Sequence, residues 1–174
     1  MTLLMSPRLR KAALTAHVTS SVGWLGAVAA FLALAVVGLT SKDADTVRAV
    51  YLVAEPLTWF LILPLAFGSL VTGLVQSLGT TWGLFRHYWV IFKLGINLFA
   101  ATVLLLYTQT VSLLARVAAE SNADLRELQG PTFVLHSAAA LLLLVTATFL
   151  AVYKPRGMTR YGRRKQRELG RVGR

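Results

Sequence analysis

The chain has 174 residues, of which 56% are hydrophobic and only 14% are charged, and its mean hydropathy is +0.63. This composition excludes an ordinary soluble domain and indicates a membrane protein. The absence of Cys excludes disulfides, c-type haem attachment, iron–sulfur clusters and thiolate zinc sites. The net charge of +11 does not indicate nucleic-acid binding, because the basic residues gather beside apolar segments, where anionic lipid headgroups are the expected partner.

Four apolar segments predict an all-α, membrane-embedded four-helix bundle within residues 1–155. The expected helices cover residues 12–39, 47–77, 88–115 and 132–153, each long enough to cross the hydrocarbon core. A cleaved signal peptide is the alternative for the first segment, but its 28 uncharged residues are about twice the length of a signal-peptide core, which favours a retained helix. Pro56 and Pro64 predict a kink near the middle of the second helix.

The distribution of basic residues predicts the orientation. Lys and Arg dominate the N-terminus, the loop at Arg86 and the chain from Lys154 onward, which holds nine of them against one Glu. The links at 41–48 and 116–130 are balanced by acids, so the positive-inside rule places both termini in the cytoplasm and the protein in the cytoplasmic (inner) membrane. The tail at 156–174 is expected to be disordered or a basic surface helix that binds anionic lipids.

Depth matching predicts a polar cluster in the cytoplasmic half of the bundle. The side chains expected in the inner half there are His17, Ser69, Thr72, Gln76, His87, Lys93 and Asn97. The alternative for Lys93 is snorkelling of its ammonium to the headgroups. The alternative for His17 is a packed ring that is hydrogen-bonded to a neighbouring hydroxyl or carbonyl.

In the outer half, Glu55 and His136 are expected at comparable depths. A carboxylate that faces lipid is unfavourable, so Glu55 should face the bundle, a water-filled entry or His136 itself. At the opposite interface Trp82, Tyr88 and Trp89 are typical of an aromatic belt rather than a substrate site.

Small residues predict where the first two helices touch. Thr19-xxx-Gly23-xxx-Ala27 lies on the first helix and Ser69-xxx-Gly73 lies on the second. Both patterns let helix backbones approach closely in a membrane.

The sequence contains no nucleophile triad, phosphate-binding loop, zinc-protease motif or dinucleotide-binding loop, and no metal site is expected. The remaining redox option is haem b, which needs axial side chains within the bundle. Depth allows a bis-His site only for His17 with His87. A His17 ligand with Lys93 near a propionate, or as the second ligand, is geometrically easier.

Short motifs resemble those of small bacterial membrane families. His17 followed by Gly23-Trp24-Leu25-Gly26, Trp89-Val-Ile-Phe-Lys93-Leu94 and Tyr153-Lys154-Pro155 are similar to motifs of the copper-resistance-D-like proteins and the membrane protoporphyrinogen oxidases. The resemblance implies a four-helix bundle and, in the porphyrin branch, haem coordination by His17 with Lys93 nearby. Where that branch has an Arg and an Asn-Glu pair before the fourth helix, this chain has Gly130-Pro131-Thr132, so it looks closest to uncharacterised members.

The sequence therefore favours a structural or interaction subunit of the cytoplasmic membrane. Its expected partners are anionic lipids, bound through the basic tail, and a second membrane protein or another copy of the chain. The alternative is a haem-b-binding or redox bundle that uses His17 and Lys93.

Overall fold

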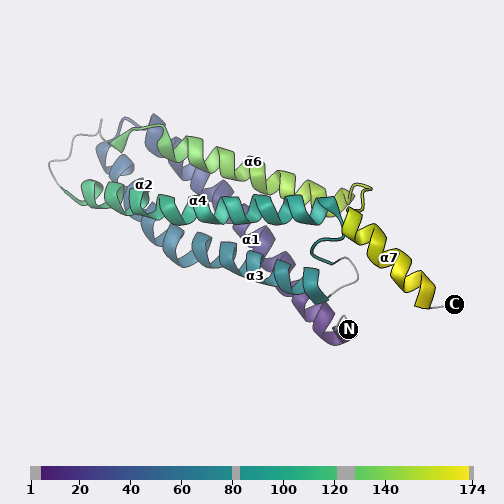
Figure 1. Cartoon of the computed structure of the whole chain (residues 1–174). Coiled ribbons are helices and arrows are strands. Elements are labelled where there is room, and N and C mark those ends of the chain that lie inside the picture. The colour runs from purple at the N-terminus through teal and green to yellow at the C-terminus, as the bar shows by residue number, and fades with distance from the viewer. Residues whose placement is uncertain (1–4, 80–82, 121–127, 173–174) are drawn as a thin grey trace.

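The computed structural model describes residues 5–79, 83–120 and 128–172, and all its named elements are helices (Figure 1). They are α1 (Pro7–Thr40), α2 (Ala44–Leu57), the π-helical turn η1 (Thr58–Ile62), α3 (Leu63–Gly79), α4 (Tyr88–Ala119), α6 (Thr132–Tyr153) and α7 (Arg160–Val172). Because α2, η1 and α3 run on as one helix, there are four spans long and apolar enough to cross a membrane in the described chain. This confirms the predicted all-helical, four-span architecture. Trp82 and the link residues Asp124, Arg126 and Glu127 lie outside the described residues.

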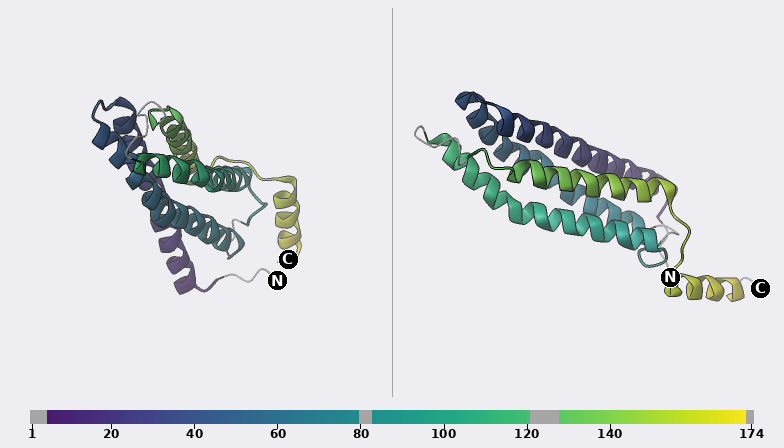
Figure 2. Two further views of the ribbon diagram at one scale, coloured as in Figure 1. Left: turned by 90° about the vertical axis from the view of Figure 1, so that its left-hand side faces the viewer. Right: turned by 90° about the horizontal axis from the view of Figure 1, so that it is seen from above.

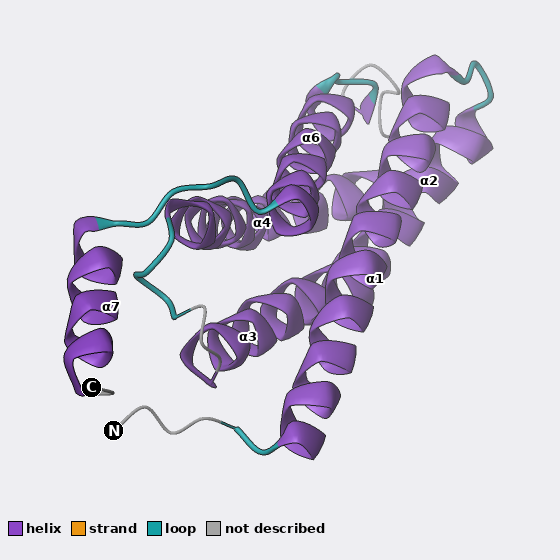
Figure 3. Cartoon of the chain, turned by 90° about the vertical axis from the view of Figure 1, so that its right-hand side faces the viewer, coloured by secondary structure: helices purple, strands orange, loops and turns teal. Residues whose placement is uncertain are grey.

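The four spans form a bundle in which each helix has two neighbours. The second span and α6 each pack against both α1 and α4, so α1 and α4 occupy opposite corners (Figure 2). The start of α1 and the whole of α7 lie at the same end of the bundle (Figures 1 and 3). We call this the proximal end and the opposite one the distal end.

Helix α1 begins five residues before the predicted first helix, at Pro7. The hydroxyl of Ser6 accepts a hydrogen bond from the Leu9 N–H, and Pro7 is preorganised for the first helical turn. The basic residues that follow are therefore helical. The apolar pattern marked only the part of α1 that lies in the hydrocarbon.

The second span departs from α-helical geometry between its two prolines. Pro56 and Pro64 have no N–H to donate, and between them the Leu63 N–H donates to the Thr58 carbonyl, as a π-helix requires. The Thr58 hydroxyl donates to the Ala54 carbonyl over 2.7 Å. A π-helical turn therefore lies near the middle of the span, between the two prolines that predict a kink there.

Aromatic rings fill the distal half of the bundle. Phe133 on α6 lies 5.2 Å from Phe31, 4.8 Å from Tyr51 and 6.0 Å from Tyr107, measured between ring centroids. The outside of the bundle is also apolar, since side chains such as Phe60 are as much as 82% exposed. A bundle that is hydrophobic on both its inner and outer faces is suited to lipid.

The predicted contact between the first two spans is confirmed at two glycines. A Cβ atom on Gly23 of α1 would lie 3.3 Å from Leu65 of α3, and one on Gly73 of α3 would lie 3.1 Å from Cε1 of His17. The absence of a side chain at Gly73 therefore lets the His17 ring lie directly against α3.

The basic tail, expected to be either disordered or a surface helix, contains helix α7. Helix α6 ends at Lys154, whose φ of 43° is left-handed, and Pro155 follows, which is a common way for a helix to stop. Thr159 then caps α7, because its hydroxyl accepts the Gly162 N–H over 3.0 Å.

Candidate functional site

His17 is held between α1 and α3 at the proximal half of the bundle. The residue is only 7% exposed, and its Nδ1 lies 3.1 Å from both the Ser69 carbonyl oxygen and the Thr72 hydroxyl. A carbonyl can only accept, so we assign the ring proton to Nδ1 and the lone pair to Nε2.

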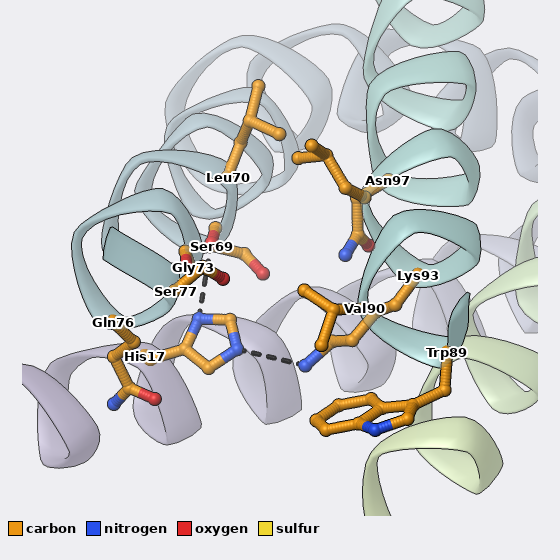
Figure 4. Close-up of a pocket in the computed structure, with 11 residues that line it drawn as sticks. His17, Ser69, Leu70, Gly73, Gln76, Ser77, Trp89, Val90, Lys93 and Asn97 are labelled. Atoms are coloured by element: carbon orange, nitrogen blue, oxygen red, sulfur yellow. Dashed lines mark hydrogen bonds between the residues drawn. The ribbon is translucent and has the colours of Figure 1, made fainter. Parts of the chain in front are cut away.

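Lys93 is the hydrogen-bond partner of the other ring nitrogen of His17, Nε2. Its Nζ lies 3.1 Å from Nε2 of His17, and the ammonium donates because Nε2 carries the lone pair. The Lys93 side chain therefore reaches across from α4 to His17 (Figure 4). Asn97, one turn further along α4, is 7% exposed and lies on the same face as Lys93.

Hydroxyl groups fix the rest of this proximal cluster. The hydroxyls of Ser21 on α1 and Ser69 on α3 lie 2.8 Å apart. The Thr72 hydroxyl donates to the Gly68 carbonyl over 2.5 Å, which leaves its oxygen free to accept from His17. Polar contacts thus join one turn of α1, at His17 and Ser21, to one turn of α3, at Ser69 and Thr72. Such interhelical hydrogen bonds stabilise helix packing in a membrane.

A cavity of about 100 Å³ opens beside the cluster, and we call it the proximal cavity. Its polar and aromatic lining residues are His17, Ser69, Gln76, Ser77, Trp89, Lys93 and Asn97. The structure therefore brings together predicted side chains from three separate helices, but His87 of the predicted cluster does not line this cavity. Sequence reasoning assigned Trp89 only to the interfacial belt, although the spacing 89, 93, 97 puts it on the helix face of Lys93 and Asn97.

The predicted pair of Glu55 and His136 is not formed. The His136 ring stacks on Tyr107 with centroids 4.0 Å apart, and its Nδ1 turns back to the carbonyl of Thr132, 2.9 Å away. Glu55 is half-buried, and among the described residues no hydrogen bond or ion pair involves its carboxylate. Equal depth did not bring the two residues together, because α2 and α6 are not neighbours in the bundle but occupy opposite corners, each packed against α1 and α4.

His136 instead lines a second, apolar cavity of about 220 Å³ in the distal half. Trp24, Thr58 and Tyr107 also line it, so this cavity lies against the π-helical turn. His87 lies at the start of α4, with its ring 6.4 Å from that of Trp89, and it is not among the residues that line the proximal cavity. The bis-His arrangement of His17 and His87 is therefore not formed.

The proximal cluster does not fit a haem. The lone pair that would ligate iron, on Nε2 of His17, accepts the hydrogen bond from Lys93. The proximal cavity of about 100 Å³ is also below the ~300 Å³ at which pockets for drug-sized ligands begin. Among the described residues, no three His, Asp or Glu side chains are placed to hold a metal ion.

No protein-family model, curated protein or solved structure matches the chain. The resemblance to the copper-resistance-D-like and protoporphyrinogen-oxidase-like group therefore stays a prediction. What the site can do is argued below from its own residues.

Proposed function

We propose that the protein is a structural or interaction subunit of the bacterial cytoplasmic membrane, which presents a fixed basic helix to anionic lipids at the cytoplasmic surface. The observation that carries this proposal is the attachment of α7 to the connection between α3 and α4. A cationic tail that served only as a topology signal would need no defined position.

Hydrogen bonds between the two segments make that attachment. The Thr159 N–H donates to the Arg86 carbonyl over 3.0 Å, the Thr159 hydroxyl donates to the Phe85 carbonyl over 2.6 Å, and the Tyr88 N–H donates to the Gly157 carbonyl over 3.3 Å. The contact is tight, because a Cβ atom on Gly162 would lie 2.4 Å from the Arg86 carbonyl oxygen. These contacts support a tail with a set place at the end of the bundle.

The charge of α7 supports a lipid surface as the partner. The side chains of Arg160, Arg163, Arg164 and Arg167 are exposed, and the only ion pair in the described part of the chain joins Arg164 to Glu168. Basic residues near an anionic membrane surface contribute about 1 kcal/mol each to binding. Helix α7 therefore carries enough unneutralised charge to bind such a surface.

The cytoplasmic location of this end follows from the positive-inside rule. Reporter fusions after residues 45 and 125 should read as external, and fusions at the C-terminus should read as cytoplasmic. A cytoplasmic signal from residue 45 would contradict the orientation and the proposed lipid partner.

The lipid contact is tested by hydrogen exchange of the full chain in nanodiscs. Amides of α7 should be better protected in discs that contain phosphatidylglycerol than in discs of phosphatidylcholine alone. Replacing Arg163, Arg164 and Arg167 by Gln should remove about 3 kcal/mol of attraction and abolish the difference. The matched control replaces the three basic residues of the N-terminus, Arg8, Arg10 and Lys11, and should leave α7 protection unchanged. Equal protection in the two kinds of disc would refute the proposal.

An absorption spectrum separates this function from the haem alternative. The purified protein should show no Soret band after haem supplementation, because Nε2 of His17 is engaged by Lys93. If a Soret band appears and His17→Ala abolishes it, the proposed function is wrong and the protein binds haem through His17.

A further inference from the structure

The ammonium of Lys93 has no counter-charge among the described residues that line the proximal cavity. Lys93 carries the only formal charge among the residues that line the proximal cavity, and its one hydrogen-bond partner in the described chain is the uncharged ring nitrogen of His17. The sequence has no Asp or Glu before Asp43 and none between Glu55 and Glu120. The three helices that meet at this cavity, α1, α3 and α4, therefore contain no acid at all.

Two further donors at the cavity lack partners. The side-chain amide of Asn97 makes no hydrogen bond with the described residues although the residue is 7% exposed, and Nε2 of Gln76 is buried without a partner. Unsatisfied buried polar groups are rare and usually indicate a water or an ion that occupies the site. Water can satisfy the hydrogen bonds, but it does not neutralise the ammonium.

The Asn97 amide and the Lys93 ammonium approach one space. Both side chains project from the same face of α4 toward α3 (Figure 4), since they are four residues apart. Gln76 lies on the other side of the His17 ring (Figure 4). Charge-assisted hydrogen bonds are the strong ones to an oxyanion, and α4 offers such a donor, the Lys93 ammonium, beside the neutral amide of Asn97.

The depth of Lys93 matches the phosphate layer of a bilayer. Helix α4 has 32 residues, or about 48 Å at ~1.5 Å per residue, against a hydrocarbon core of ~30 Å. About 9 Å at each end of a centred α4 therefore lies outside the core. Lys93 is five residues after Tyr88, the first residue of α4, or about 8 Å along the axis, which places it at the boundary between headgroups and hydrocarbon.

We propose that the proximal cavity binds the phosphate group of an anionic ligand, with Lys93 supplying the counter-charge and Asn97 a hydrogen bond. A volume of about 100 Å³ suits one such group rather than a larger organic molecule. The ammonium excludes cations. The phosphate belongs either to an inner-leaflet phospholipid or to free inorganic phosphate, and these two sources share the same chemistry at the site.

The test uses the full-length protein purified in mild detergent. Native mass spectrometry measures retained phosphatidylglycerol, and ³¹P NMR measures the affinity for added inorganic phosphate. Lys93→Met should reduce the binding that wild type shows by tenfold or more, as expected for loss of a charge-assisted contact. Lys11→Met removes the same charge from an exposed position at the proximal end, outside the cavity, and should bind like wild type.

Asn97→Asp is the second variant, because it places a carboxylate of the same size beside Lys93. The new carboxylate should neutralise the ammonium and exclude the ligand without loss of folding, measured by size-exclusion chromatography. If wild type retains phospholipid and Lys93→Met does not, the phosphate comes from a lipid. If the protein responds only to added inorganic phosphate, the ligand is free phosphate. Binding that survives Asn97→Asp, or that is absent from wild type in both measurements, overturns the proposal. Neither native mass spectrometry nor ³¹P NMR measures the hydrogen exchange of α7. Failure of the phosphate site is therefore distinguishable from failure of the proposed lipid contact of α7.

Discussion

Gly162→Ala should detach α7 from the end of the bundle. The added methyl carbon would lie 2.4 Å from the carbonyl oxygen of Arg86 and 3.1 Å from its carbonyl carbon. Both are backbone atoms, so the clash cannot be relieved by rotating a side chain. The first turn of α7 must therefore move away from the connection between α3 and α4.

The structure sets the size of this effect. Detachment loses the hydrogen bonds that join residues 157–159 to residues 85–88. The three of 3.3 Å or less that Thr159 and Tyr88 donate amount to ~3 kcal/mol at about 1 kcal/mol each. That is roughly a 150-fold shift from the attached toward the detached state, since ~1.4 kcal/mol corresponds to a factor of 10.

Hydrogen exchange of two amides measures the shift. The N–H groups of Thr159 and Tyr88 both donate across the contact, so their protection should fall by about two orders of magnitude in Gly162→Ala. The matched control is Gly157→Ala, whose new methyl would meet only the Tyr88 ring at an ordinary 3.6 Å. In this variant the Thr159 and Tyr88 amides should exchange as in wild type. Unchanged protection of Thr159 in Gly162→Ala would refute the docked position of α7.

Two other predictions concern packing and capping. Gly73→Ala puts a methyl carbon 3.1 Å from Cε1 of His17, so it should destabilise the protein by about 1 kcal/mol, measured as a lower Tm. The control Gly95→Ala adds a methyl with nothing within 4 Å and should not lower the Tm. Equal losses of Tm in the two variants would refute the close packing at Gly73. Hydrogen bonds from Thr46 hold the pKa of the Asp43 carboxylate below its ordinary 3.8, so the cap stabilises the start of α2 above that pH and is lost as the pH falls below it. In wild type, the protection of the Thr46 amide against hydrogen exchange should fall as the pH drops through the lowered pKa of Asp43. In Asp43→Ala this protection should be low at every pH. Protection of Thr46 that does not change with pH in wild type would contradict the role of Asp43 as the N-cap of α2.

The sequence was sufficient to predict the four spans and the level at which polar residues gather. A hydrophobic run longer than the membrane core has one stable outcome, and residue counts along α1, α3 and α4 convert directly into depth. This is why His17, Gln76, Lys93 and Asn97 were predicted to lie together. Depth gave no information on which spans are neighbours, and the predicted pairing of Glu55 with His136 is wrong because α2 and α6 occupy opposite corners of the bundle.

Features that depend on contacts distant in sequence were not predictable. The Thr159 hydroxyl donates to a carbonyl 74 residues earlier, and no local pattern marks either partner. The assignment of both ring nitrogens of His17 also requires the positions of Ser69 and Lys93, because composition cannot specify a tautomer.

The two proposed sites lie close together at the start of α4, and their charges should act in different ways. Helix α7 is bonded to residues 85–88, and Lys93 follows about 8 Å further along the axis. At the proximal cavity, the exposed charges on α7 act only by raising the local concentration of anions, an effect screened beyond the ~8 Å Debye length of physiological salt. The half-buried Lys93 contacts the ligand directly and is screened much less. Loss of the α7 charges should therefore weaken phosphate binding at low salt and have little effect at high salt, whereas Lys93→Met should weaken it at both.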